Sequence, residues 1–216
     1  MLPLLLALST LTSGQPAAVP TGTLESVNEL DAPHRFRGGL VIGATVGAGL
    51  MGASGYPNNV TQIGDPSYYS ASAWMGGTAE TLFVMGALTD YLSFGFWFGH
   101  SSASNRDWHS SGDGGGLRVE VFPLAGLVPS LEGWGVLGQF GLGSEKLTST
   151  RPGLPEASGT QSFVGAGTFY EWSFGHFLGG HFGVGPNVEF DAIWSQAVER
   201  HGLTVSARLV FYGGGG

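Results

Sequence analysis

The stretch Leu92-Ser-Phe-Gly-Phe-Trp-Phe98 alternates apolar side chains with small ones, and a similar alternation runs through Leu203 to Tyr212 near the end of the chain. A period of two indicates extended chain, because successive side chains of a β-strand point to opposite faces. One parity carries large apolar residues, and the other carries Gly, Ser, Thr and a few charges. This arrangement is typical of a β-barrel with an apolar outer wall and a polar interior.

The composition supports a barrel rather than a water-soluble domain. Of the 216 residues, 42% are apolar and only 11% are charged, and the mean hydropathy is +0.15. A soluble domain carries about 25% charged residues. The sequence contains no apolar run of about 18 residues, so a membrane-spanning helix is not predicted. A barrel accounts for both the high apolar content and the lack of a long apolar run, because it distributes its apolar residues over alternate positions.

The charge and the cysteine content exclude several classes of function. The formal net charge is −8, and the eight Lys and Arg residues are scattered along the chain. A nucleic-acid partner is therefore not expected, because such proteins present clustered basic residues. The chain has no cysteine, which excludes disulfides, cysteine-bound zinc and thiol catalysis.

The N-terminal stretch Met1 to Leu8 is apolar and is followed by small and polar residues up to Gly14. This pattern predicts a secretory signal peptide over residues 1–18, cleaved near Gly14 or Ala18. A short buried helix is the alternative. We expect a flexible leader over 19–37, the barrel over 38–212 and a glycine tail over 213–216.

Eight extended segments are predicted from alternation and turn residues. They cover residues 38–53, 70–87, 91–101, 115–128, 133–147, 160–173, 176–192 and 202–212. Short connections are expected at 89–90, 129–132 and 173–175, and long polar ones at 54–69, 102–114, 148–159 and 196–201. Short and long turns in alternation favour an all-β fold, a closed antiparallel up-and-down transmembrane barrel of about eight strands.

Several charged or polar residues fall on the parity assigned to the lumen. This predicted lumen network comprises Glu80, Arg118, Glu120, His181, Glu189 and Arg208. Charges inside a narrow barrel are costly unless they are paired, so we expect salt bridges that fill the lumen. A proton or ion path through the same groups is the functional alternative.

Aromatic residues near the expected strand ends predict belts at two membrane interfaces. The predicted interface aromatics are Trp74, Tyr91, Trp134, Trp172, Trp194 and Tyr212. Trp97 shares the parity of glycine and serine, and we expect it near a rim. A sugar-binding platform around Trp108 is the alternative for the aromatic residues.

Motifs for catalysis or cofactors are weak. The sequence Gly47-Ala-Gly-Leu-Met-Gly52 matches G-x-G-x-x-G, but the residues after it do not begin a helix, as a dinucleotide site requires. The pairs His100-Ser101 and His109-Ser110, with Asp107 or Asp113, suggest a serine hydrolase, but neighbouring residues of a strand face opposite sides. We therefore expect no catalytic residue, no metal site and no cofactor.

Two segments resemble a known family. Ala87 to Phe96 looks like a tight turn and the following strand, and Gly202 to Phe211 is similar to a C-terminal strand that ends in an aromatic residue. Both are characteristic of the small outer-membrane β-barrels of Gram-negative bacteria, the eight-stranded OmpA- and OmpX-like barrels. The resemblance implies a location in the bacterial outer membrane, with outer-membrane lipid and the barrel-insertion machinery as partners. It departs from the family in the four glycines after Tyr212.

The leading functional expectation is a non-enzymatic barrel with a lumen filled by side chains. It would serve envelope integrity or surface interaction through its external loops, and the sequence identifies no external partner. Two alternatives remain open. One is a secreted, lipocalin-like soluble barrel that binds an apolar ligand, which requires apolar residues inside. The other is an outer-membrane lipid hydrolase.

Overall fold

The computed structural model describes residues 37–214, so the expected signal peptide 1–18 and nearly all of the leader 19–37 lie outside the described residues. The strands are β1 (Gly39–Gly55), β2 (Ser70–Ala71), β3 (Met75–Thr89), β4 (Leu92–Ser104), β5 (Trp108–Val121), β6 (Trp134–Ser149), β7 (Ala157–Tyr170), β8 (Trp172–Phe177), β9 (Gly180–Trp194) and β10 (Val198–Gly213). Two single-turn 3₁₀ helices, η2 (Pro66–Tyr68) and η3 (Pro129–Leu131), lie in connections. Within residues 37–214 no helix is long and apolar enough to span a membrane.

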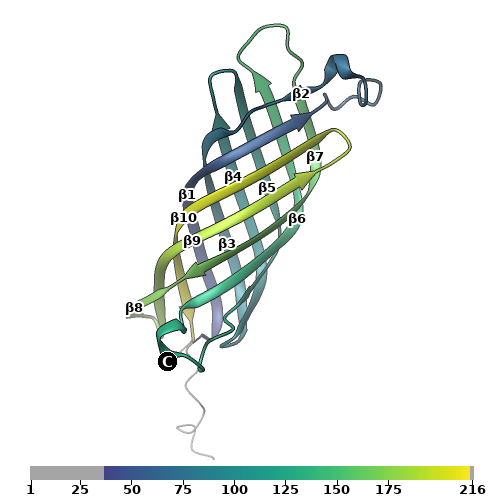
Figure 1. The fold of residues 1–216 in the computed structure, drawn as a ribbon. Helices are drawn as coiled ribbons and strands as arrows, with labels where there is room; N and C mark the ends of the chain where they lie inside the picture. Colours follow the sequence, from purple (N-terminus) through teal and green to yellow (C-terminus); the bar gives the residue numbers. More distant parts are fainter. Residues whose placement is uncertain (1–36, 215–216) are drawn as a thin grey trace, which may run out of the picture. The chain divides into compact units, whose positions relative to one another are not determined.

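Eight long strands close into an antiparallel barrel, which confirms the predicted fold class. Their order is β10-β1-β3-β4-β5-β6-β7-β9, and β9 pairs with β10 to close the ring (Figure 1). The first and last long strands, β1 and β10, pair with each other, and their register runs without a shift from Val41↔Tyr212 to Gly55↔Val198. Closure leaves the long strands without free edges, as a membrane barrel requires.

The short strand β8 continues the path of β7 along β9, since both β7 and β8 pair with β9. The tight turn before β9 lies at Leu178 and Gly179, which both have positive φ, as a two-residue hairpin turn requires. The expected turn at 173–175 is therefore wrong. Gly175, with φ +61°, sits at a register shift inside β8, so this glycine makes a bulge rather than a turn.

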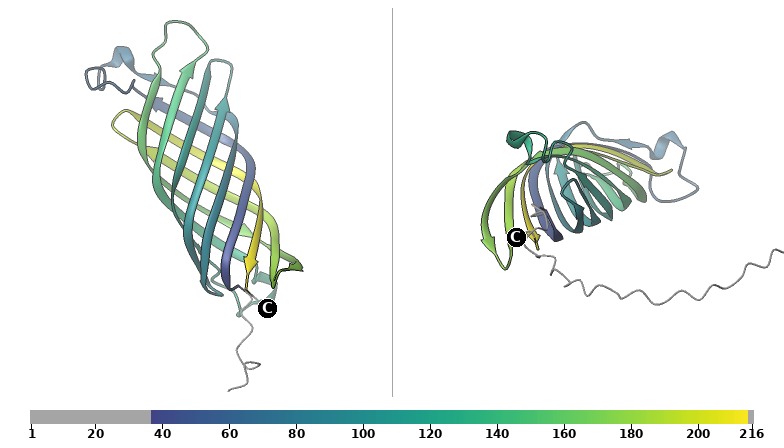
Figure 2. Two further views of the ribbon diagram at one scale, coloured as in Figure 1. Left: turned by 180° about the vertical axis from the view of Figure 1, so that it is seen from behind. Right: turned by 90° about the horizontal axis from the view of Figure 1, so that it is seen from below.

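The connections lie at two ends of the barrel (Figure 2). At the terminal end, where β1 begins and β10 ends, they cover 90–91, 122–133 and 178–179; at the loop end they cover 56–74, 105–107, 150–156 and 195–197. The expected strict alternation of short and long turns is wrong. Most of 102–114 is strand, because β4 and β5 pair up to Ser104↔His109, and the expected short turn 129–132 belongs to a longer segment. This part of the hairpin consists mostly of serine and glycine. It has few of the large apolar residues whose alternation identifies a strand in the sequence.

The two faces of the wall differ in polarity as the alternation predicts. On β10 the outward Leu203, Val205 and Leu209 are about half exposed, whereas the inward Arg208 is completely buried. This inverted polarity contradicts the lipocalin-like alternative, which needs an apolar interior and a charged outer wall.

The lumen also holds large apolar side chains. Phe83, Trp97 and Phe163 belong to one buried interior cluster, and the rings of Trp97 and Phe163 lie 4.5 Å apart between centroids. Trp97 is only 3% exposed, so its expected position near a rim is wrong. A glycine on the next strand makes room for it: a Cβ at Gly114 would come within 2.8 Å of the Trp97 ring. Small interior residues thus accommodate a few large ones.

Candidate functional site

The lumen contains a charge cluster nearer the terminal end. This terminal-end cluster consists of Arg118, Glu120, Glu171, Glu189 and Arg208. Arg208 binds Glu120 through both terminal nitrogens, at 2.7 and 2.8 Å, and its Nε donates to Glu171 at 2.6 Å. Arg118 donates to Glu120 at 2.7 Å and to Glu189 at 3.3 Å. The forked guanidinium groups therefore link strands on opposite sides of the barrel.

Aromatic rings and a phenol complete this cluster. The guanidinium carbons of Arg118 and Arg208 lie 4.5 and 4.6 Å from the centroid of the Phe83 ring. The hydroxyl of Tyr212 donates to Glu171 at 2.8 Å. Cation–π contact and charge-assisted hydrogen bonds together offset part of the cost of burying these ions. The buried side chains of the cluster therefore occupy the lumen near the terminal end.

A second cluster lies nearer the loop end. In this loop-end cluster, Arg200 donates to Glu145 and to Asp191, each at 2.9 Å. The same side chain also donates to Ser101, and Ser110 donates to Glu145. Each of the two clusters holds one more carboxylate than arginine. The second cluster joins β4, β5, β6, β9 and β10 across the lumen.

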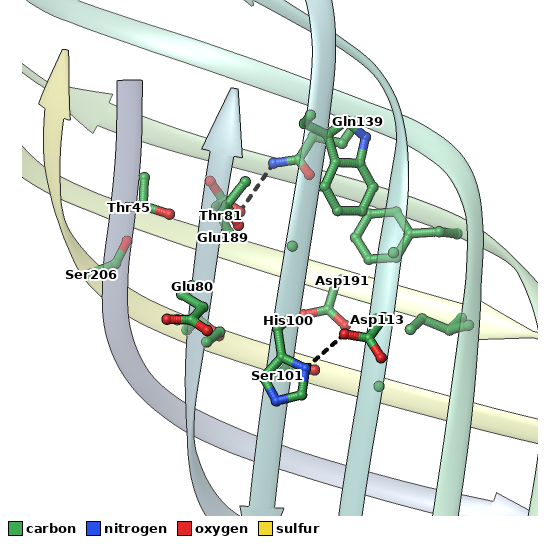
Figure 3. Close-up of a pocket in the computed structure, with 18 of the residues that line it drawn as sticks. Thr45, Glu80, Thr81, His100, Ser101, Asp113, Gln139, Glu189, Asp191 and Ser206 are labelled. Carbon is green, nitrogen blue, oxygen red and sulfur yellow. Dashed lines mark hydrogen bonds and ion pairs between the residues drawn. The ribbon is translucent and has the colours of Figure 1, made fainter. Parts of the chain in front are cut away.

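A cavity of about 50 Å³ remains between the clusters. Its lining includes Trp97, Phe163, Glu189 and Asp191, and Figure 3 shows Glu189 next to Gln139, which donates to it at 3.1 Å. A volume of this size accommodates only a few water-sized molecules. This cavity is therefore small, and its lining also includes Glu80, His100 and Asp113 of the outer face.

The structure brings together four of the six residues predicted for the lumen network, Arg118, Glu120, Glu189 and Arg208. His181 also lies in the interior, 5% exposed, where its ring stacks on Tyr212 at 5.1 Å between centroids.

Glu80 is the exception. It is exposed on the outer face, on the parity of Leu82 and Val84. The expectation that Glu80 lies in the lumen is therefore wrong. Large apolar residues occupy both parities of β3, because Phe83 and Met85 fill the interior, and the alternation alone could not assign its faces.

Tyr212 is also misplaced by the sequence prediction, because it is 1% exposed and lies in the lumen on the parity of Arg208. The other predicted interface aromatics lie at or near the ends of strands and are partly or fully exposed. Tyr91, Trp134 and Trp172 lie at the terminal end, and Trp74 and Trp194 lie at the loop end.

The predicted lumen network omitted five charged residues, Arg37, Glu145, Glu171, Asp191 and Arg200. Glu171 falls between β7 and β8, and its inward parity with Phe169 was the available signal. Arg200 lies before the expected start of the last strand, and Glu145 shares the parity of interior residues on β6. Arg37, the last residue of the expected leader, is buried: its backbone N–H donates to Asp90 at 2.8 Å and its side chain to the Glu132 carbonyl at 2.9 Å.

The residues of the hydrolase alternative are separated by the barrel wall. Ser101 and Ser110 are buried in the lumen, whereas His100 faces outward and binds Asp113 at 2.8 Å between Nδ1 and Oδ1. Among the residues described, the His100 ring has no other hydrogen-bond partner. Within residues 37–214, no three His, Asp or Glu side chains are grouped so that they could hold a metal ion.

No family model matches this chain, and no curated protein matches it in sequence. The structure does match solved structures. The attachment invasion locus protein Ail of Yersinia pestis matches with a TM-score of 0.51 at 11% identity, over 81% of this chain and 99% of Ail. Neisserial surface protein A matches with a TM-score of 0.45 at 11% identity, over 80% of this chain and 96% of its own.

The N-terminal β-barrel domain of OprF from Pseudomonas aeruginosa matches with a TM-score of 0.41 at 14% identity, over 80% of this chain and 98% of that domain. The match with Ail is the one that supports the fold, and it shows the fold alone. The fold is that of a small outer-membrane β-barrel, as the resemblance of the sequence implies.

Proposed function

We propose that this protein is a barrel of the bacterial outer membrane with a closed lumen, which supports envelope integrity or surface interaction through its external segments. One observation carries the proposal: apolar residues such as Leu203 and Val205 are exposed while Arg208, Glu120 and Arg118 are completely buried. Water as the only solvent would favour the reverse. Lipid around the wall accounts for both faces.

The strand lengths fit this location. A tilted β-strand needs about 10 residues to cross the apolar core of a membrane. Strands β1 and β10 have 17 and 16 residues, so they extend beyond that core. The extra length falls toward the loop end, where outward residues such as Ser102, Ser104 and Lys146 are polar. We place the terminal end in the periplasm and the loop end outside the cell.

The proposed role is structural rather than catalytic or conducting. The ion pairs of the lumen fix the strands against each other, and the cavity between them is about 50 Å³. Outer-membrane lipid and the barrel-insertion machinery are the proposed partners, the latter through the β10 strand. The segment 56–74 is the longest connection at the loop end, and it exposes Tyr68, Tyr69 and Trp74.

The proposal is tested by expressing the mature chain and separating the membrane fraction. We expect the protein to require detergent for extraction and to migrate differently on gels before and after heating, because a closed barrel resists unfolding by detergent. Planar-bilayer recordings should show no steady conductance. A protein that stays soluble without detergent would contradict the proposed location, and a stable open channel would contradict the closed lumen.

A further inference from the structure

The connection 56–74 joins β1 to β3 at the loop end and is held to the barrel at both of its ends. Within it, β2 pairs with the end of β1. The Tyr56 N–H donates to the Ala197 carbonyl at 2.6 Å, and the Ser70 hydroxyl donates to the Pro155 carbonyl at 2.6 Å. Hydrogen bonds to two neighbouring connections therefore fix where this segment lies.

The middle of the segment is ordered by its own side chains. The side-chain oxygen of Asn59 accepts from the Thr61 N–H at 3.1 Å. The Asp65 carboxylate accepts in the same way from the Ser67 N–H at 2.9 Å. Such turns set the backbone locally. Ile63 lies between them and packs against the buried apolar cluster of the loop end. The surface is thus preorganised, which lowers the cost of binding a ligand.

Three aromatic side chains of this segment are exposed. Tyr68, Tyr69 and Trp74 are 36%, 48% and 60% exposed. The ring of Tyr56 supports that of Tyr69, with centroids 5.2 Å apart and planes inclined at 59°. An exposed aromatic ring offers an apolar face, and a phenol or indole adds a hydrogen-bonding group.

The sugar-binding alternative named Trp108, and the structure favours these three residues instead. Trp108 is only partly exposed and packs against the same buried apolar cluster as Ile63. Its ring therefore contributes to the interior of the loop end rather than to a binding surface.

The polar groups of 56–74 are almost all uncharged. Asp65 is its only charged residue, and the carboxylate also accepts from the Ser67 hydroxyl at 2.8 Å. The exposed residues Asn58 and Thr61 add an amide and a hydroxyl. Without Lys or Arg, the segment has no cation to pair with phosphate or sulfate. A ligand that fits this surface has apolar ring faces and many hydroxyls but no charge, and an uncharged saccharide has all three properties.

The segment projects to the side of the barrel mouth (Figure 1, Figure 2). Trp74 lies against the outer wall, because a Cβ on the neighbouring Gly52 would lie 3.9 Å from its ring. In an outer membrane, the glycolipids of the external leaflet carry their sugar chains at this level, beyond the apolar belt of the wall. A position beside the wall favours these chains over a protein that approaches from outside the cell.

We propose that the segment 56–74 binds uncharged sugar units of the glycolipids in the external leaflet. Tyr68, Tyr69 and Trp74 stack on the apolar faces of the sugar rings, and the amide of Asn58 binds sugar hydroxyls. This inference rests on the membrane location proposed above. Through this contact the barrel is tied to the lipid that surrounds it.

The test uses the full mature barrel in detergent micelles. The probes are two uncharged polysaccharide chains, one of mannose and one of galactose, released from lipid A by mild acid. Saturation-transfer-difference NMR measures binding, since a released chain has no acyl group that could enter the micelle. We expect transfer from the barrel to at least one chain and none from empty micelles. In the triple variant Tyr68→Ser, Tyr69→Ser and Trp74→Ser, binding should be about tenfold weaker, because the stacking contacts are lost.

Two variants serve as controls. Trp172→Ser removes an indole of similar exposure, 58%, at the terminal end, and it should leave sugar binding unchanged. The triple variant Tyr68→Phe, Tyr69→Phe and Trp74→Phe keeps the ring faces and should retain most of the binding. All of these side chains are exposed, so folding should not be affected, and heat-modifiable migration on gels checks this.

Three outcomes would overturn the inference: no saturation transfer to either chain, undiminished binding in the serine triple variant, or an equal loss in Trp172→Ser. The first outcome would favour a protein partner for this surface. A failure of the proposed location is distinct. A protein that stays soluble without detergent would contradict the location, whereas a barrel that needs detergent but does not bind the chains would contradict only the sugar assignment.

Discussion

The two faces of one barrel wall use charge differently. In the lumen, Arg208 and Glu120 form a bidentate ion pair, and both side chains are completely buried. On the outside of the same barrel, His100 and Asp113 form a pair with side chains 46% and 75% exposed. The inner pair is held in place by aromatic rings and further partners, whereas the outer pair lies exposed on the outer wall.

This difference teaches what each position can do. A buried ion that loses its partner cannot be solvated, so the inner charges fix the structure. The exposed outer charges contribute little to stability, because solvent screens them. Substitutions on the two faces should therefore differ in their effect on stability.

The largest expected effect is at the centre of the terminal-end cluster. Arg208→Ala leaves Glu120 and Glu171 without their shared partner and should lower the free energy of unfolding by about 3–5 kcal/mol. Urea unfolding in detergent micelles, followed by tryptophan fluorescence, measures this. Asp113→Asn on the outer face is the contrast, with an expected change within about 0.5 kcal/mol. Equal losses at the two positions would abolish the distinction between the faces.

The next effect concerns the apolar part of the lumen. Trp97→Ala removes a ring that is 3% exposed and packs on Phe163, and it should destabilise the barrel by about 3 kcal/mol. Trp74→Ala, at a residue 60% exposed, should cost far less. The same unfolding curves measure both variants. Brominated lipid should quench Trp74 more than Trp97, and the reverse order would put Trp97 outside the lumen.

A smaller effect is expected at the terminal end. Arg37→Ala removes a hydrogen bond to the Glu132 carbonyl and a guanidinium 3.6 Å from the centroid of the Phe122 ring. We expect a loss of about 1–3 kcal/mol and faster hydrogen exchange in 122–133. Unchanged exchange in that segment would show that Arg37 does not hold it.

The smallest effect is expected at the loop end. Arg151 binds Asp107 at 2.6 Å, but its side chain is 63% exposed. Arg151→Ala should therefore change the free energy of unfolding by less than about 1 kcal/mol. A loss as large as that of Arg208→Ala would mean that exposure does not set the value of these ion pairs.

Much of the fold was predictable, because the alternation is clear wherever large apolar residues occupy only one face of a strand. On β10 the residues Leu203, Val205 and Leu209 identify the outer face and place Arg208 inside. On β3 the same argument fails, since Phe83 and Met85 fill the lumen while Leu82 and Val84 cover the wall. Glu80 was therefore assigned to the wrong side.

The partners of the inner charges were less predictable than their side. Parity placed Arg118, Glu120 and Arg208 in the lumen, but Glu171 and Tyr212 join them only through the closure of β7 and β8 with β9 and β10. Likewise Arg200 and Glu145 are 55 residues apart in the chain and meet across the barrel. No spacing in the sequence indicates such contacts.

The sequence by itself determined the barrel class and the face of most residues, because the two-residue period of a strand is a local property that composition reveals. The tertiary structure decided which charges pair, where Trp97 lies and how Glu80, His100 and Asp113 come to lie in one row on the outer wall. These depend on the register between strands, and register is set by the closure of the whole barrel rather than by any one segment.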